Sequence, residues 1–146
     1  LQKAWDTLVP EDWDAAFGAN LYAAYGCLLA VLPGMRRRGR GRIVNIGYGR
    51  AEQLAAFPGI LPYAAAKTAL LLVTRTAAAG EAGTGITVNM VSPGLLRGGV
   101  LPGGIEPNSP ALGTFADVAN AVRFLVSPEA ERISGTNLIV AGTWKM

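Results

Sequence analysis

Residues 42–47 read RIVNIG, a short apolar run that begins with a charged residue and ends with a glycine. Residues 86–92 (ITVNMVS) and residues 137–141 (NLIVA) are two further short runs rich in apolar residues. β-Branched side chains are frequent in all three runs. Strands that are nearly continuous in apolar residues are typical of a parallel sheet covered on both faces. The three runs therefore predict three buried parallel strands.

Segments with helical periodicity alternate with these runs. Apolar side chains recur at helical spacing over residues 10–38, which predicts a helix ended by the glycine at position 39, and Pro33 predicts a late kink in it. Further helices are predicted over residues 61–79 and over residues 115–126, the second of them opened by the capping-box sequence TFAD. Helix and strand thus alternate along the chain.

This alternation defines an α/β protein. It predicts the C-terminal half of a doubly wound parallel-sheet, Rossmann-type fold with three strands and three main helices. The outer edge of the strand at 42–47 would expose unpaired N–H and C=O groups in an apolar ladder. We therefore expect a preceding N-terminal half to supply the neighbouring strand, and a partner subunit is the weaker candidate for that edge.

Composition narrows the classes of function. The 146 residues allow one domain, and 51% hydrophobic with 16% charged residues describe a chain that can bury a core. Because the chain has no histidine and one cysteine, Cys27, a zinc site or a Ser-His-Asp triad is excluded. Cys27 lies in an apolar helical pattern, so we expect a buried structural thiol in a reducing compartment.

Charge and hydropathy bear on location and partners. We find no signal peptide and no apolar run of the about 20 residues that span a bilayer, which predicts a cytoplasmic protein that does not enter a membrane. The net charge of +3 comes largely from arginines between positions 36 and 42. This cluster lacks interleaved aromatic residues, so it favours the negative end of a helix dipole over a nucleic-acid site, and no nucleic-acid partner is expected.

Residues 63–67 read YAAAK, which places a phenol and an ammonium one helical turn apart on one helix face. An isolated tyrosine has a pKa of about 10, and a nearby fixed positive charge lowers it. Tyr63 would then be a general acid for a carbonyl oxygen that receives hydride, or a base for an alcohol that loses it. Alone, this spacing is a weak signal, because a solvated lysine beside a core tyrosine produces it too.

The context of the pair is more specific. The stretches GRIVNIG (41–47), PYAAAKTAL (62–70), GITVNMVSPG (85–94) and ISGTNLIVAG (133–142) resemble, in this order, the short-chain dehydrogenase/reductase family, especially its 3-oxoacyl-(acyl-carrier-protein) reductase-like members. The resemblance is collinear over nearly the whole chain. It implies that residues 1–146 are a partial NAD(P)-binding Rossmann-type domain, namely the catalytic half without the phosphate-binding N-terminal half, and that the cofactor is NADP or NAD.

The resemblance also assigns roles to residues. Tyr63 would be the proton donor, and Lys67 would hydrogen-bond the nicotinamide ribose and lower the pKa of Tyr63. Asn20, in the sequence FGAN, matches the family's helical asparagine, which supports a water-linked proton relay to the lysine. A polar residue that merely faces solvent is the alternative for Asn20.

Pro93 and Gly94 match the family's Pro-Gly motif. In the family, the backbone from this motif onward contacts the nicotinamide carboxamide, which here extends to Leu96. A Pro-Gly turn would end the strand and expose backbone groups at its carboxyl end, where α/β folds bind ligands. A purely structural turn is the alternative.

The sequence departs from the family at the serine that binds the substrate oxygen. The matching position is Tyr48, and neither Ser nor Thr occurs between Asn45 and Tyr63. Tyr48 would either supply a hydroxyl donor from a different position or mark the loss of the donor, which typically costs about 10²–10³ in rate. The loop over residues 95–113 is also short for the family's mobile substrate lid.

The predicted function is hydride transfer between a nicotinamide and a small carbonyl or alcohol substrate, with Tyr63 as general acid/base. A catalytically weak or inactive relative that binds a ligand or serves oligomerisation is the alternative, and a self-sufficient binding module is disfavoured by the exposed strand edge. The family's long helices pack against their copies in a neighbouring subunit, and here they correspond to residues 13–32 and 63–79. The resemblance therefore implies a homodimer or homotetramer.

Overall fold

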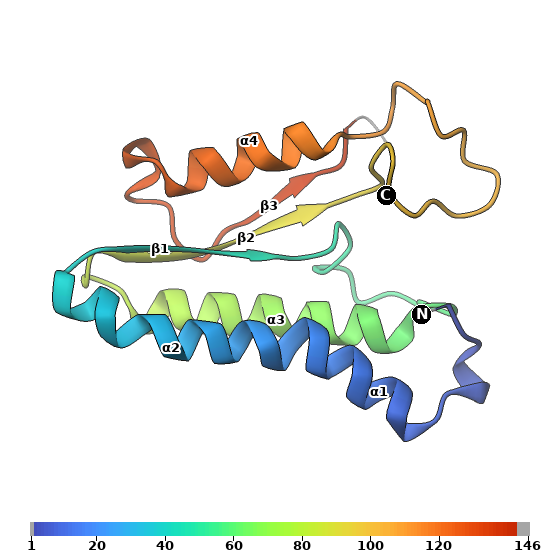
Figure 1. The fold of residues 1–146 in the computed structure, drawn as a ribbon, viewed down its shortest axis with the longest axis horizontal. Helices are drawn as coiled ribbons and strands as arrows, with labels where there is room; N and C mark the ends of the chain where they lie inside the picture. Colours follow the sequence, from blue (N-terminus) through green and yellow to red (C-terminus); the bar gives the residue numbers. More distant parts are fainter. Residues whose placement is uncertain (1, 143–146) are drawn as a thin grey trace.

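A computed structural model describes residues 2–142. Three strands form one sheet, with α2 and α3 side by side on one face and α4 on the other (Figure 1). The elements are η1 (Trp5–Thr7), α1 (Pro10–Phe17), η2 (Gly18–Tyr22), α2 (Ala23–Arg38), β1 (Gly41–Ile46), α3 (Leu61–Gly80), β2 (Ile86–Pro93), α4 (Phe115–Val126), η3 (Pro128–Ala130) and β3 (Asn137–Val140). The sequence-based prediction of an α/β half-fold with three strands and three main helices is confirmed.

The sheet is parallel throughout, in the order β1-β2-β3. β1 pairs with β2 from Gly41 opposite Ile86 to Ile46 opposite Val91, and β2 pairs with β3 up to Pro93 opposite Val140. Since the three strands run in one direction, their carboxyl ends lie at one edge of the sheet. In open α/β sheets this is the edge that binds ligands.

The central strand β2 forms the core of the molecule. Val88, Met90 and Val91 are fully buried, because α3 covers one face of this strand and α4 the other. On the α3 side, Leu28 and Leu32 of α2 pack with the amino-terminal half of β2. Burial on both faces explains why the strand is a continuous apolar run rather than an alternating one.

The long N-terminal helix differs from the sequence-based prediction. The chain is helical from Pro10 to Arg38, but its irregular turn is a π-helical one at Gly18–Tyr22, and α2 continues through Pro33 without a break. The helix therefore continues past Pro33, and the kink expected there stays a prediction. The proline removes only one helical N–H donor, and Leu32 beside it is buried on the sheet, which holds that turn in place.

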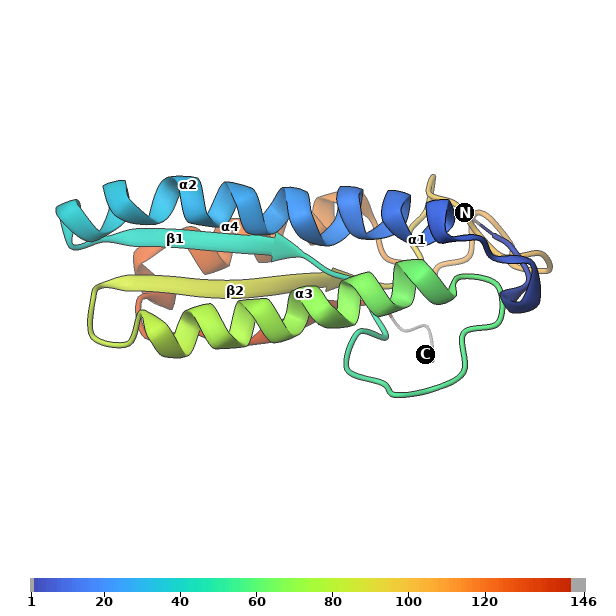
Figure 2. The same cartoon turned by 90° about the horizontal axis from the view of Figure 1, so that it is seen from below.

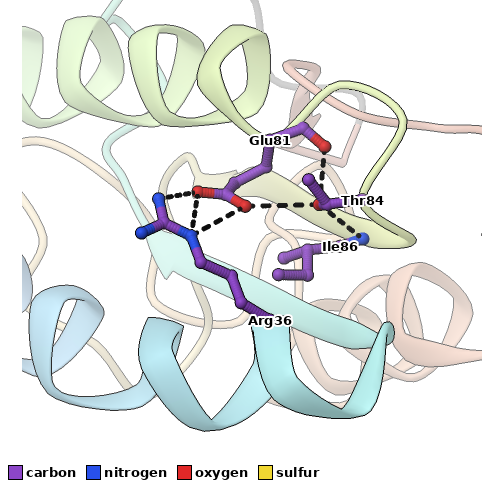
Figure 3. Close-up of polar contacts among 4 residues, drawn as sticks. All are labelled: Arg36, Glu81, Thr84 and Ile86. Carbon is purple, nitrogen blue, oxygen red and sulfur yellow. Dashed lines mark hydrogen bonds and ion pairs between the residues drawn. The ribbon is translucent and has the colours of Figure 1, made fainter.

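The arginine cluster lies where a helix end was predicted. Arg36, Arg37 and Arg38 form the last turn of α2, and Gly39 ends the helix in the left-handed conformation with φ of 62°. The Arg36 guanidinium binds the carboxylate of Glu81, which is 3% exposed, with Nε donating to Oε1 at 3.0 Å (Figure 3). This contact joins the end of α2 to the end of α3, at the amino end of the strands.

Thr84 extends this contact to the sheet. Its hydroxyl lies 2.7 Å from the main-chain oxygen of Glu81 and 3.2 Å from the carboxylate, and it accepts the N–H of Ile86 at 3.4 Å (Figure 3). Because Ile86 is the first residue of β2, the buried carboxylate fixes two helix ends and the start of the central strand together. Arg36 is the main reason why the pKa of Glu81 is lowered.

The outer side of α2 and α3 is apolar. Large exposed side chains on it include Tyr25, Leu29 and Leu72, which are 45%, 50% and 68% exposed. Cys27 is exposed too, so the prediction of a buried thiol is wrong: it faces away from the sheet, whereas Leu28, its neighbour, is buried.

The helical stretch Pro10–Arg38 is also long and apolar enough to cross a membrane, by length and composition only, and 11% of its most apolar window is buried. The expectation that no segment is apolar over about 20 residues therefore does not hold for this stretch. Its charged residues lie at the two ends, and residues 15–35 between them carry apolar, small or uncharged polar side chains only. An exposed apolar helix face of this size is typical of a surface that contacts another protein or a membrane.

Glu81→Gln in the full-length protein is expected to lower the midpoint of thermal unfolding, because the substitution removes the buried counter-charge of Arg36. The folded-state pKa of Glu81 is lowered, so its contribution to stability is complete above the ordinary pKa of 4.5 and is lost as the pH falls through the folded value. The difference between the two midpoints should therefore shrink on acidification.

The matched control is Glu131→Gln, since the Glu131 side chain is 59% exposed and lies 3.7 Å from Arg132. Exposed pairs of this kind contribute little to stability. Equal midpoints for the Glu81 variant and the parent protein near neutral pH would contradict the structural role of this carboxylate.

Candidate active site

The carboxyl ends of the strands meet the amino-terminal end of α3 (Figure 2). Tyr63 lies in the first turn of α3, and Lys67 lies one turn further along. Pro62 precedes Tyr63 at a position where a proline is favourable, since first-turn N–H groups have no helical acceptor. Both side chains are partly buried. The edge of the sheet and the start of this helix therefore present the predicted pair together.

Lys67 is tied to the end of β1. Its Nζ donates a hydrogen bond of 2.8 Å to the carbonyl oxygen of Ile46, the last residue of the strand. It also lies 5.8 Å from the ring centroid of Tyr63. The phenol and the ammonium thus share one wall at the carboxyl end of the strands. Burial lowers the pKa of Lys67.

The protonation of Tyr63 differs from the expectation that a nearby ammonium lowers its pKa. Burial raises the pKa of Tyr63, and the neighbouring Tyr48 raises it further. The ammonium of Lys67 is bonded to a carbonyl oxygen and lies beside the ring. In this structure the Tyr63 hydroxyl is therefore held in its protonated form at neutral pH, the form that donates a proton.

Tyr48 stands beside Tyr63, at the position of the expected serine. The two ring centroids are 5.6 Å apart with an interplanar angle of 66°, an edge-to-face pair. Phe57 packs on the other side of Tyr48 at 5.9 Å. Burial raises the pKa of Tyr48, while Arg50 opposes that rise. The structure therefore brings Tyr48 to the catalytic pair within a small cluster of aromatic rings.

Asn20 lies in the π-helical turn of Gly18–Tyr22. Its side-chain Nδ2 donates 2.9 Å to the carbonyl oxygen of Ala16, one turn back in the same helix, and the residue is partly buried. The turn packs against α3. Among residues 2–142 no hydrogen bond joins Asn20 to Tyr63 or Lys67, so the structure places Asn20 beside the helix of the pair without linking their side chains.

The Pro-Gly turn ends β2 at the expected edge, but it does not leave its first backbone groups free. The carbonyl of Pro93 accepts the N–H of Gly49 at 2.8 Å, and the N–H of Gly94 donates to the carbonyl of Val140 at 2.9 Å. Leu96 forms an isolated parallel bridge with Gly113. The expectation that this turn bares backbone groups is wrong at Pro93 and Gly94, because these groups tie three chain segments together.

Arg50 and Phe57 also belong to this wall, and neither was predicted from the sequence. The guanidinium carbon of Arg50 lies 4.9 Å from the ring centroid of Phe57, and its Nε donates 2.7 Å to the side-chain oxygen of Gln53. Arg50 comes two residues after Tyr48, in the loop between β1 and α3. An arginine two residues from the expected serine position was the available signal, but the contact with Phe57 depends on how the loop folds.

A parallel sheet with helices on both faces is the arrangement of a doubly wound α/β fold, which binds ligands at the carboxyl edge of its strands, where Tyr63 and Lys67 lie. A family model described as enoyl-(acyl carrier protein) reductase matches residues 1–143. The chain belongs to the short-chain dehydrogenase/reductase family of oxidoreductases.

Individual relatives agree with this membership. The chain is 39% identical over 146 residues to the (2S)-((R)-hydroxy(phenyl)methyl)succinyl-CoA dehydrogenase subunit BbsC of Thauera aromatica, covering 92% of this chain and 57% of the relative. It is 36% identical over 141 residues to the 3-oxoacyl-(acyl-carrier-protein) reductase of Haemophilus influenzae, covering 90% of this chain and 57% of the relative. The chain thus spans less than two thirds of the length of these relatives.

The solved structure of a gluconate 5-dehydrogenase from Burkholderia cenocepacia, in complex with NADP and tartrate, superposes with a TM-score of 0.86 at 31% identity. The match covers 97% of this chain and 59% of that protein. The fold of the described residues is therefore that of the C-terminal half of a family member.

Gly47→Ala tests how the strand end holds the site. A Cβ at this position would lie 2.3 Å from Ser92 Oγ and 2.5 Å from Met90 Sδ, and both of these residues are fully buried. We expect a loss of stability of about 1–3 kcal/mol, the usual cost of overpacking a core, measured by urea unfolding of the full-length protein.

Gly59→Ala is the control, because a Cβ there meets nothing within 4 Å. Its effect should stay within about 0.5 kcal/mol, as for ordinary surface substitutions. A Gly47 variant as stable as the Gly59 variant would show that the end of β1 can move away from β2.

Proposed function

We propose that the full-length protein is an NAD(P)-dependent oxidoreductase that interconverts a small carbonyl compound and its alcohol, with Tyr63 as the general acid/base. The observation that carries this proposal is the shared wall of Tyr63 and Lys67 at the carboxyl end of β1, fixed by the 2.8 Å bond from Lys67 to Ile46. Family membership supplies the reaction class.

Each residue of the proposed site has a separate role in proton transfer, charge stabilisation or positioning. In the direction of reduction, the Tyr63 hydroxyl donates its proton to the carbonyl oxygen as negative charge develops there. The Tyr48 hydroxyl is the second donor to the same oxygen and stabilises that charge. Lys67 holds Tyr63 and the end of β1 in register, and Asn20 supports proton supply from the neighbouring turn. In the direction of oxidation, deprotonated Tyr63 accepts the proton of the alcohol.

The donor set at this edge fits a nicotinamide nucleotide. An ammonium has three N–H donors, and Lys67 uses one of them on Ile46. The remaining donors suit a ribose diol. Since the Pro93 carbonyl and the Gly94 N–H are bonded within the fold, the backbone groups that follow them, up to Leu96, would hold the carboxamide. When bound, the nicotinamide supplies or accepts the hydride. NADP or NAD is the proposed cofactor, in line with the NADP complex of the gluconate 5-dehydrogenase.

Tyr63→Phe is expected to lower kcat/KM for carbonyl reduction by about 100-fold or more, because general acid catalysis typically contributes 10²–10⁴-fold. The measurement is carbonyl-dependent oxidation of NADPH or NADH by the full-length protein. Tyr22→Phe is the matched control, since it removes a phenol that is 62% exposed on another helix. Full activity of the Tyr63 variant would show that another group moves the proton.

A second candidate function is a catalytically weak family member that binds a ligand. The observation that favours it is Tyr48, whose ring fills space beside Tyr63 where a small serine is expected. Tyr48→Phe and Tyr48→Ser separate the two proposals. Loss of about 10²–10³ in rate for Tyr48→Phe identifies a working donor, whereas an inactive parent that gains activity on Tyr48→Ser identifies an obstructed site.

We also propose that the protein is a cytoplasmic homo-oligomer whose subunits meet through the outer side of α2 and α3. A groove between these helices is lined by Tyr25, Leu28, Leu32 and Leu72. Leu28 and Leu32 in its floor belong to the buried core, so the groove continues that core to the surface. Burial of this face against a second copy would remove a large apolar area from water, which stabilises association.

Leu29→Glu combined with Leu72→Glu is expected to shift the full-length protein from dimer or tetramer to monomer, because each charge would be buried at the interface without a partner. Sedimentation at micromolar concentration measures the shift. Val100→Glu, at a side chain that is 90% exposed in a loop, is the control. A parent protein that sediments as a monomer, or partitions into membranes, would contradict the proposed interface.

A further inference from the structure

Arg50 is a basic residue of the site whose neighbours are an aromatic ring and an amide instead of an acid. Its guanidinium carbon lies 4.9 Å from the centroid of Phe57, and its Nε donates to Gln53 at 2.7 Å. It also lies close enough to the Tyr48 hydroxyl to oppose the rise in its pKa. Arg50 is partly buried, and it belongs to none of the ion pairs found among residues 2–142.

The acid nearest to it in sequence is committed elsewhere. Glu52 forms an ion pair with Arg75 of α3, outside the Tyr48–Tyr63 wall. The other cation of the wall, Lys67, is bonded to a carbonyl oxygen and likewise has no carboxylate partner among the described residues. The side chains around Tyr48 and Tyr63 therefore include two cations that have no carboxylate partner among the described residues.

The packing holds the guanidinium in place and leaves its hydrogen-bonding capacity open. A guanidinium that lies over an aromatic ring is attracted through the face of the ring. The N–H groups of the guanidinium can therefore still donate hydrogen bonds to another group. A guanidinium has five N–H donors, and the bond to Gln53 uses one. A half-buried cation without a counter-charge is costly, and a bound carboxylate offsets that cost with bidentate geometry.

We propose that Arg50 is a specificity-determining residue that binds a carboxylate of the substrate, so that the carbonyl group of the same molecule faces Tyr63 and Tyr48. The substrate class is therefore a short keto acid or the corresponding hydroxy acid. This inference rests on the proposed function, because it assigns a recognition element to the same site. Phe57 and Gln53 position the guanidinium.

The test compares a keto acid with its neutral analogue. Acetoacetate and methyl acetoacetate, and the equivalent pair of pyruvate and methyl pyruvate, are assayed with the full-length protein and NADPH or NADH. For at least one pair the acid should be preferred in kcat/KM by about 10-fold or more, since hydrogen bonds to charged groups contribute about 1.5–3 kcal/mol. Arg50→Gln should raise KM for the acid by far more than KM for the ester and so reduce the preference to near unity, and Arg50→Lys should restore part of it.

Arg132→Gln is the matched control, because it removes the same charge from a side chain that is 91% exposed at the amino end of β3. A preference for the acid that survives Arg50→Gln, or turnover of both members of each pair with no preference in the parent protein, overturns the inference while the proposed reaction stands.

A binding measurement separates the two proposals. Titration calorimetry of the same keto acids into the cofactor-loaded protein should show binding that Arg50→Gln weakens by about 10-fold or more and that Arg132→Gln does not change. Binding that depends on Arg50 without turnover supports the carboxylate site and contradicts the proposed reaction. Absence of both binding and turnover overturns the assignment of a short keto acid.

Discussion

The hydrogen bond from Lys67 to the carbonyl oxygen of Ile46 is the contact on which the site depends. It joins the second turn of α3 to the last residue of β1, two elements separated by a loop of 14 residues, from 47 to 60. Because Tyr63 is one turn away on the same helix, this single bond also sets where the phenol stands relative to the sheet edge. A charged donor makes such a bond shorter and stronger than a neutral one.

The two ends of the molecule are built differently. At the amino end of the strands, Arg36, Glu81 and Thr84 form a closed network in which the charges satisfy one another. At the carboxyl end, Lys67 and Arg50 are bonded to a carbonyl and an amide oxygen. The first arrangement fixes the packing of helices on the sheet. The second leaves positive charge without an acidic partner among the described residues, which is the electrostatic condition for binding an anionic substrate or nucleotide.

The sequence allowed the fold to be predicted well, because the signals involved are local. The strand and helix positions follow from apolar periodicity, and the capping box of Thr114 and Asp117 opens α4 as the sequence TFAD indicated. The π-helical turn at Gly18–Tyr22 has no comparable local signature, and it depends on packing against α3. Cys27 shows the same limit, since only the angular position of a residue on its helix separates a buried from an exposed neighbour.

The meeting of three candidate residues at one edge could be predicted, but their chemical state and the presence of Arg50 could not. Tyr63, Lys67 and Tyr48 meet at one edge, as their order in the sequence indicated. The pKa of Tyr63 is raised instead of lowered because its value depends on burial and on where the ammonium points. Likewise, the free backbone groups expected at Pro93 and Gly94 are bonded to Gly49 and Val140, which lie far from them in sequence.

The replacement at Tyr48 changes more than one hydroxyl. A tyrosine brings a ring that packs edge-to-face on Tyr63 and on Phe57, and the Phe57 ring in turn holds Arg50. A serine could make none of these ring contacts. Phe57, whose ring supports Arg50, would then lose its packing against position 48. The aromatic residue at this position and the unpaired guanidinium two residues later therefore form one feature. The Tyr48 ring occupies space beside Tyr63, and through Phe57 it supports the guanidinium of Arg50. The loop between β1 and α3, rather than the Tyr-Lys pair that the family shares, thus carries the residues on which the proposed carboxylate preference rests.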